Sequence, residues 1–279
     1  MSILITPEKI QQEVVNLPAF PPAVYGLLSD LEDENAGMMV MAQHVERDPI
    51  LAGRVLSTAN RLLRNEGWPE VRDVYTAVSL IGFAQIREIV LTTCISGSNK
   101  NLASQHLQWS HSLAAGIAAK ELASRVKCNH DEALVAGLLH DVGQFWLAYV
   151  RPLEFQQVRL QVEVHNVEIS EAERAMFGVD HCEVGRIIAE HWQLPKEITD
   201  AIAHHHAPAD KIAGNPIVAS VHLAEMIVQA LDLPHRDLNY VSRLSSIACR
   251  ALGIDWDKDN LSLLGAIDAR YQYALSVFP

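Results

Sequence analysis

Hydrophobic residues recur every three or four positions along most of the chain, which is the spacing of one face of an α-helix. Helix-start signals precede three of these segments, at Thr6-Pro7-Glu8, Asp48-Pro49 and Asn215-Pro216. Alternation bounded by hairpin dipeptides is not evident, and the sequence has no Asn-Gly or Asp-Gly pair. The pattern predicts an all-α protein with roughly a dozen helices.

Two further helix starts are expected in the second half of the chain. Ser170 followed by Glu173 fits a capping box, in which the two side chains bond each other's backbone amides. Asp180 is placed to cap a helix that runs to about Trp192.

The chain divides into three expected parts. Residues 1–105 form an N-terminal helical region, residues 106–232 a larger helical domain that carries most of the histidines, and residues 233–279 a helical tail. The polar tract Ser96-Gly97-Ser98-Asn99-Lys100-Asn101 is the expected boundary between the first two parts.

Composition narrows the class of protein. The chain has 279 residues, of which 49% are hydrophobic and 20% charged, so it can bury a large core and is not mainly disordered. Its formal net charge is −12, with 34 Asp and Glu against 22 Lys and Arg. That balance argues against general nucleic-acid binding, which needs a basic face to replace phosphate counterions.

Cysteine usage and hydropathy predict a cytoplasmic protein that does not cross a membrane. The N-terminus has no basic segment followed by a long apolar run, so it does not read as a secretory signal. The best candidate for a span, residues 217–233, is interrupted by His222 and Glu225. The four cysteines show no paired metal or redox spacing and are expected in the core: Cys94, Cys128, Cys182 and Cys249.

Six of the histidines lie in four short segments that carry the candidate site residues. The chain has 13 histidines, and the segments are Trp109–Gly116, Ala136–Gly143, Asp180–Gly185 and Ala201–Pro208. Imidazole and carboxylate are good ligands for divalent Fe, Mn, Zn or Ni, and a carboxylate can bridge two such ions. His140 and Asp141 are adjacent, so they converge only if they lie near a helix end.

The order of these segments resembles the HD superfamily of metal-dependent phosphohydrolases. More closely, the chain is similar to the HD-related output domain (HDOD) family of bacterial signalling proteins, from about Leu17 to Leu231. The matching motifs in the first part are Leu17-Pro18 with Pro21, Asp48-Pro49-Ile50-Leu51, Ala59-Asn60 and Ala77-Val78-Ser79-Leu80-Ile81-Gly82. Those in the second are Gly137-Leu138-Leu139-His140-Asp141-Val142-Gly143, His181 with Gly185, Trp192-Gln193-Leu194-Pro195, and His205-His206 with Pro208.

The resemblance implies an HD-like helical bundle with a pocket for one or two divalent metal ions. The implied ligands are His111, His140 and Asp141 for a first ion, and Asp141, His181 and His205, with His206 as a further candidate, for a second. The family's late Asp has its nearest match in Glu225, which is one methylene longer. The alternative is structural: hydrogen-bonded core histidines, a His140–Asp141 pair that caps a helix end, and Glu225 in a solvated face or an ion pair.

Two accessory features of related cyclic-di-GMP phosphodiesterases are missing. Gln144 stands where those enzymes usually have Lys, which removes a cation that could pair with phosphate. Ala207-Pro208-Ala209-Asp210 stands where they have a Gly-Tyr-Pro motif.

Two classes of function follow from these features. The first is a regulatory signalling module that binds a protein partner or a phosphorylated small molecule without turnover. A dimer is one of the expected oligomeric states. The second is a metal-dependent phosphohydrolase or phosphodiesterase, in which the metal supplies an activated water and Asp141 is the essential catalytic-site ligand. Neither class implies general nucleic-acid or membrane binding.

Other polar and aromatic residues are expected to be structural. Asn60 is interpreted as a packing and hydrogen-bonding residue, and Trp109 and Trp192 as core or rim aromatics. The histidines expected to have no role in the site are His44, His106, His130, His165, His191, His222 and His235, and His204 is left out of the ligand set.

Overall fold

A computed structural model describes residues 4–17, 37–64, 69–95, 102–126, 128–206, 209–231, 233 and 244–276. Those residues form fifteen α-helices and one 3₁₀-helix, with no strand among them. The all-α prediction is therefore confirmed. The proline-rich links within residues 18–36 and the polar tract at 96–101 lie outside the described residues.

The N-terminal region comprises α1 (Pro7–Glu13), η1 (Val14–Asn16), α3 (Met38–Val45), α4 (Pro49–Arg64) and α5 (Val74–Ile95). Two predicted helix starts are confirmed here. The Thr6 side chain accepts a hydrogen bond from the Lys9 amide, and Asp48 Oδ1 accepts one from the Leu51 amide at 2.8 Å. Helix α5 is interrupted at Gly82, where φ is +73° and the backbone leaves the helical region.

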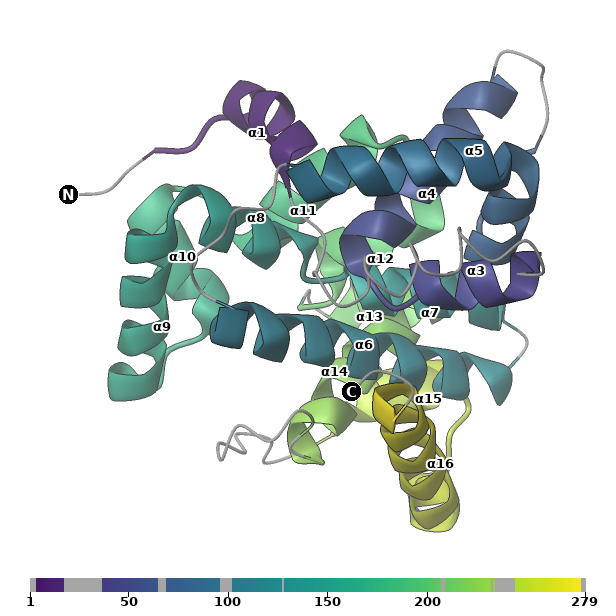
Figure 1. Cartoon of the computed structure of the whole chain (residues 1–279). Helices are drawn as coiled ribbons and strands as arrows, with labels where there is room; N and C mark the ends of the chain where they lie inside the picture. The colour runs from purple at the N-terminus through teal and green to yellow at the C-terminus, as the bar shows by residue number, and fades with distance from the viewer. Residues whose placement is uncertain are drawn as a thin grey trace.

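The histidine-bearing part consists of α6 (Leu102–Ser124), α7 (His130–Leu139), α8 (Val142–Val150), α9 (Pro152–His165), α10 (Ile169–Phe177), α11 (His181–His191), α12 (Lys196–His204), α13 (Ala209–Gly214) and α14 (Pro216–Ala230). Helix α6 packs along α7 and α14, while α12 packs against α7, α11 and α14. Helices α9 and α10 form a hairpin at one edge of the molecule (Figure 1). The tail contains α15 (Ser246–Ala251) and α16 (Trp256–Ser276), and α16 packs on α6.

Two glycines let helices cross closely enough to bring the histidine segments together. A Cβ on Gly137 would lie 2.8 Å from the Ala115 carbonyl oxygen, so the α6–α7 crossing leaves no room for a side chain. A Cβ on Gly143 would lie 2.0 Å from the carbonyl oxygen of His181. The start of α8 therefore lies directly against the start of α11, which places Asp141 beside His181.

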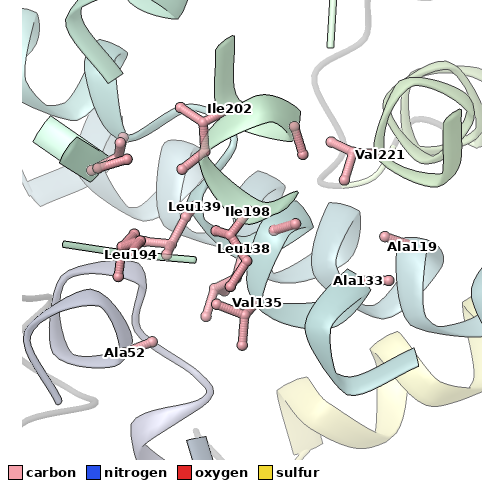
Figure 2. Close-up of a cluster of buried hydrophobic side chains, with 14 of the residues drawn as sticks. Ala52, Ala119, Ala133, Val135, Leu138, Leu139, Leu194, Ile198, Ile202 and Val221 are labelled. Carbon is pink, nitrogen blue, oxygen red and sulfur yellow. The ribbon is translucent and has the colours of Figure 1, made fainter. Parts of the chain in front are cut away.

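A continuous hydrophobic core joins the N-terminal helices to the histidine-bearing helices. Figure 2 shows part of it, with side chains from α4, α6, α7, α12 and α14 directed toward the space between these helices. The labelled residues are Ala52, Ala119, Ala133, Val135, Leu138, Leu139, Leu194, Ile198, Ile202 and Val221. The division at residues 105 and 232 stays a prediction.

Polar contacts also link the two regions. Asn60 donates from its amide to the Val71 carbonyl at 3.0 Å and accepts from the Val71 amide at 2.7 Å, which confirms its structural role. The neighbouring Arg72 guanidinium then lies 3.1 Å from Glu132 of α7 and 3.0 Å from Glu197 of α12. Arg72 thus joins the first turns of the two helices whose other ends carry His140 and His205. Trp109 and Trp192 are both buried, as expected.

One described segment, residues 130–150, is long and apolar enough to cross a membrane by length and composition. In the fold, 72% of its most apolar window is buried. The segment spans α7 and α8 and is interrupted by His140 and Asp141, so it is accounted for as core helix. It is a different segment from residues 217–233, the best candidate from the sequence.

Candidate metal centre

The predicted site residues come from five places in the fold. His111 lies within α6, His140 and Asp141 join α7 to α8, and His181 is the first residue of α11. His205 follows the last residue of α12, and Glu225 lies in α14. All six side chains are buried. Asp and Glu usually lie at the protein surface, and charged or polar side chains that are buried normally have a partner.

Asp141 lies at the centre of this cluster. Its Oδ2 is 3.9 Å from His111 Nε2 and 3.5 Å from His140 Nε2. Its Oδ1 is 3.6 Å from His181 Nε2 and 3.7 Å from His205 Nε2. The two oxygens of one carboxylate therefore face two different pairs of imidazoles, as a bridging ligand of two ions would.

Glu225 completes the first group of donors. Its Oε2 lies 2.8 Å from His111 Nε2 and 3.3 Å from His140 Nε2. The extra methylene of Glu relative to Asp therefore does not prevent the carboxylate from reaching the cluster. His111, His140 and Asp141 have donor atoms within 4.8 Å of one another, close enough to share a metal ion.

The second group is formed by His181, His205 and His206, whose donor atoms also lie within 4.8 Å of one another. The Nε2 atoms of His181 and His205 are 3.3 Å apart. His206 is exposed, and its ring centroid lies 4.3 Å from that of His205. All seven residues predicted as ligands are thus brought together, and their roles as ligands stay a prediction.

The Nδ1 atoms of three imidazoles are held by acceptors outside the pocket. His140 Nδ1 donates to the Gly137 carbonyl at 2.6 Å, and His205 Nδ1 donates to the Ile202 carbonyl at 2.9 Å. His181 Nδ1 donates to Glu173 Oε2 at 2.6 Å. A proton fixed on Nδ1 leaves Nε2 as the atom that can bind a metal, and partners of this kind orient histidine ligands in metal sites.

Glu173 is a site residue that the sequence analysis missed. It is fully buried, and its Oε2 also accepts a hydrogen bond from the His181 amide at 2.8 Å. The capping-box prediction for Ser170 and Glu173 was therefore wrong. The N-cap of helix α10 lies two residues earlier, at Glu168, and the Glu173 carboxylate turns to His181. By contrast, the predicted cap Asp180 does accept from the Glu183 amide at 2.8 Å.

Two more residues were assigned to the wrong role. His222 was expected to have none, but its Nδ1 donates to the His205 carbonyl at 2.6 Å and so fixes the backbone of a candidate ligand. Cys182 was expected in the core, but it is half-buried and its sulfur is 3.5 Å from His181 Nε2. Its position next to His181 in the sequence was the one signal that pointed to the site. Cys249 is buried as predicted.

The donor set fits a metal better than it fits a closed hydrogen-bond network. His140 Nε2 and Asp141 Oδ1 are buried, yet neither has a hydrogen-bond partner of acceptable geometry among the described residues. Such orphaned groups are costly unless another ligand satisfies them. Glu225 Oε2, by contrast, pairs with His111 Nε2 at 2.8 Å. A structural His140–Asp141 pair would bring imidazole and carboxylate into hydrogen-bond distance, whereas His140 Nε2 and Asp141 Oδ2 are 3.5 Å apart.

Burial and neighbouring charges shift the pKa values of the cluster in opposing directions. Burial alone would lower the pKa of His205, but the Cys182 thiolate and Asp141 outweigh it and raise that pKa to about 10. The pKa of His181 shifts in the same direction. Burial opposes protonation of this imidazole, but the charge of Glu173 raises the His181 pKa well above its usual range. Burial also raises the pKa of Cys182, but His205 and His181 lower it to about 6.

These shifts predict that metal binding releases protons. The raised pKa values favour the protonated forms of His181 and His205 at neutral pH without metal, whereas a metal ion needs their neutral Nε2 atoms. Apparent affinity should therefore rise with pH below the imidazole pKa values, by up to about 100-fold per pH unit if two protons leave. Calorimetric titration with Zn²⁺ in buffers of different ionisation enthalpy counts the protons. Affinity that is flat from pH 6 to pH 8 would contradict the protonation states.

Comparison with known proteins identifies the family and the fold. The HDOD domain family model matches residues 17–208. The MmoQ response regulator of Methylococcus capsulatus strain Bath is 25% identical, with a TM-score of 0.69 over 89% of this chain and 97% of that one. A virulence factor of Campylobacter jejuni shares the fold, with 19% identity, a TM-score of 0.64, and coverage of 93% of this chain and 94% of that one.

A longer protein also matches this chain. An uncharacterized protein of Treponema pallidum (strain Nichols) is 24% identical over 234 residues, which is 80% of this chain. The match covers 44% of that protein, so this chain spans less than half the length of the curated relative. The family match covers more than half of this chain and includes six of the seven predicted ligands, all except Glu225. The chain belongs to the HDOD domain family.

Proposed function

We propose that this protein is a regulatory signalling module whose pocket binds two divalent metal ions and, through them, a phosphorylated small molecule or partner. The observation that carries the proposal is the position of Asp141, whose two carboxylate oxygens face separate pairs of imidazole Nε2 atoms. A carboxylate placed in this way can bridge two ions about 3.5–4 Å apart, which together bind and polarise phosphate oxygens.

Charge explains why two ions are needed for a phosphate. Burial opposes ionisation of Asp141 and Glu225, but the nearby imidazoles lower both carboxyl pKa values well below their usual range. With neutral imidazoles, one divalent ion only cancels these two negative charges. A second ion also offsets the Glu173 carboxylate and the Cys182 thiolate, so the doubly loaded pocket is neutral overall. An anion could then bind there through open coordination positions of the two ions, although the protein as a whole is acidic.

The chain's own residues would orient rather than activate the bound phosphate. Glu173, the Gly137 carbonyl and the Ile202 carbonyl hold three imidazoles in fixed orientations. Gln144, three residues after Asp141, is neutral, so it supplies no cation to stabilise charge that develops on a leaving group. This favours ligand binding over rapid turnover.

Binding of inorganic phosphate tests the proposal. Protein reconstituted with Mn²⁺ should bind phosphate in calorimetric titrations, and the same protein after chelation and desalting should not. His204→Ala is the matched control, since His204 is adjacent to the cluster in sequence and outside the donor set. Phosphate binding that is equal with and without metal would overturn the proposal, as would its absence from protein shown to hold two ions.

The second candidate function is a metal-dependent phosphohydrolase, and the nearly complete donor set favours it. A panel of aryl phosphate monoesters, aryl phosphate diesters and cyclic dinucleotides, assayed with Mn²⁺, separates the two functions. We expect no turnover above that of Asp141→Asn. Hydrolysis by the wild-type chain that this variant loses would replace the non-catalytic proposal with the enzymatic one.

A further inference from the structure

A cysteine sulfur lies among the imidazoles of the second donor group. Cys182 follows His181 at the start of α11, and its Sγ is 3.5 Å from His181 Nε2 and 3.9 Å from His205 Nε2. The same two nitrogens are 3.3 Å from each other. The family resemblance assigns no role to this position, and the proposed phosphate chemistry does not use the thiol.

Two of these three separations match the edges of a tetrahedral metal site. With metal–nitrogen bonds of about 2.0–2.1 Å and a metal–sulfur bond of about 2.3 Å, a tetrahedral ion holds two nitrogens about 3.3 Å apart. The same bond lengths place nitrogen and sulfur about 3.5 Å apart. The Nε2–Nε2 and His181–Cys182 separations equal these values. Cys182 Sγ is 3.9 Å from both ring nitrogens of His205, so the cysteine side chain has to turn toward Nε2 to reach an ion bound there.

A fourth donor points into the same space. Asp141 Oδ1 is 3.6 Å from His181 Nε2 and 3.7 Å from His205 Nε2, which is too long for ordinary hydrogen bonds. The Asp141 side chain is 6% exposed, and this oxygen is buried without a hydrogen-bond partner in the described structure. An unpartnered oxygen aimed at the same two nitrogens indicates a ligand independently of the cysteine.

We infer that Cys182, rather than the exposed His206, supplies the fourth ligand of the second metal ion as a thiolate, which gives that ion a Cys–His–His–Asp donor set. This inference rests on the proposed function, because it requires that the pocket binds metal. Thiolate is a soft ligand, so the second position should prefer Zn²⁺ or Fe²⁺ over Mn²⁺. The first position, with imidazole and carboxylate donors only, lacks this preference. The two positions would then differ in metal selectivity although they share Asp141.

Substitution with Co²⁺ detects a sulfur–metal bond directly by absorption spectroscopy. Co²⁺ bound by a thiolate shows sulfur-to-cobalt charge-transfer absorption in the near ultraviolet, which imidazole and carboxylate ligands do not give. We expect this band in the Co²⁺-loaded wild-type chain and in Cys128→Ser, the control that removes a cysteine outside the donor group. Cys182→Ser should lose the band while it still binds cobalt through the remaining donors.

The outcomes separate this inference from the proposed function. Cobalt bound without the charge-transfer band in the wild-type chain, or a band that survives in Cys182→Ser, overturns the role of Cys182 alone. A wild-type chain that binds no cobalt overturns the proposed function, and the inference with it.

A second measurement on the unaltered protein keeps the inference testable if Cys182→Ser does not fold. Zn²⁺ should slow alkylation of Cys182 by iodoacetamide, read by peptide mass spectrometry, and leave alkylation of Cys128 unchanged. Equal labelling of Cys182 with and without bound Zn²⁺ would overturn the assignment.

Discussion

Replacement of Asp141 by asparagine should remove both metal ions from the pocket. The amide is neutral and offers one oxygen, whereas the carboxylate faces His111 and His140 with one oxygen and His181 and His205 with the other. Loss of a side chain that only hydrogen-bonds to a ligand already lowers metal affinity by about 10–100-fold. Loss of a bridging ligand should therefore lower metal affinity by more than about 100-fold. Elemental analysis after Mn²⁺ loading and desalting should fall from two ions per chain to nearly none.

His204→Ala is again the matched control for this variant, and it should retain two ions. The thermal midpoint of both variants without metal identifies any loss of ions that is caused by unfolding. A folded Asp141→Asn chain that keeps both ions would show that the carboxylate does not bridge, and that the donors come from elsewhere in the pocket.

Replacement of Glu173 by glutamine should weaken the second metal position selectively. Glu173 Oε2 accepts from both the amide and Nδ1 of His181, so it fixes the imidazole and increases the basicity of Nε2. The neutral amide removes the charge while it keeps the shape of the side chain. We expect the affinity of the second ion to fall by about 10–100-fold, with little change at the first ion, in a Zn²⁺ titration that resolves two sites.

Glu171→Gln provides the control on the same helix, because Glu171 is exposed and its substitution removes the same charge. Two outcomes would contradict the positioning role of Glu173. One is equal loss of affinity at both ions, which indicates general damage to the fold. The other is an unchanged second ion in a folded Glu173→Gln chain.

Local signals predicted the helix starts well because each depends on a few neighbouring residues. Thr6, Asp48, Asp180 and Asn215 each accept a backbone hydrogen bond in the first turn of the expected helix. The same logic failed for Ser170 and Glu173. A buried imidazole eight residues later competes for the carboxylate, and no pattern within one helix reveals that partner.

The metal cluster was predictable only in part. The order of His111, His140, Asp141, His181 and His205 gave the candidate donors through family resemblance, and their convergence depends on helix crossings that sequence spacing does not show. Gly137 and Gly143 allow those crossings, since a side chain at either position would collide with the neighbouring helix. Cys182 and His222 were missed because their roles arise from tertiary contacts with His181 and His205.

The most direct test of the central claim is a crystal structure of the protein reconstituted with Mn²⁺ and inorganic phosphate, with anomalous diffraction data collected at a wavelength sensitive to manganese. The account predicts two anomalous peaks about 3.5–4 Å apart, one on each side of the Asp141 carboxylate, with phosphate density in contact with both. A pocket with no anomalous peak, or peaks that lie away from Asp141, would contradict it.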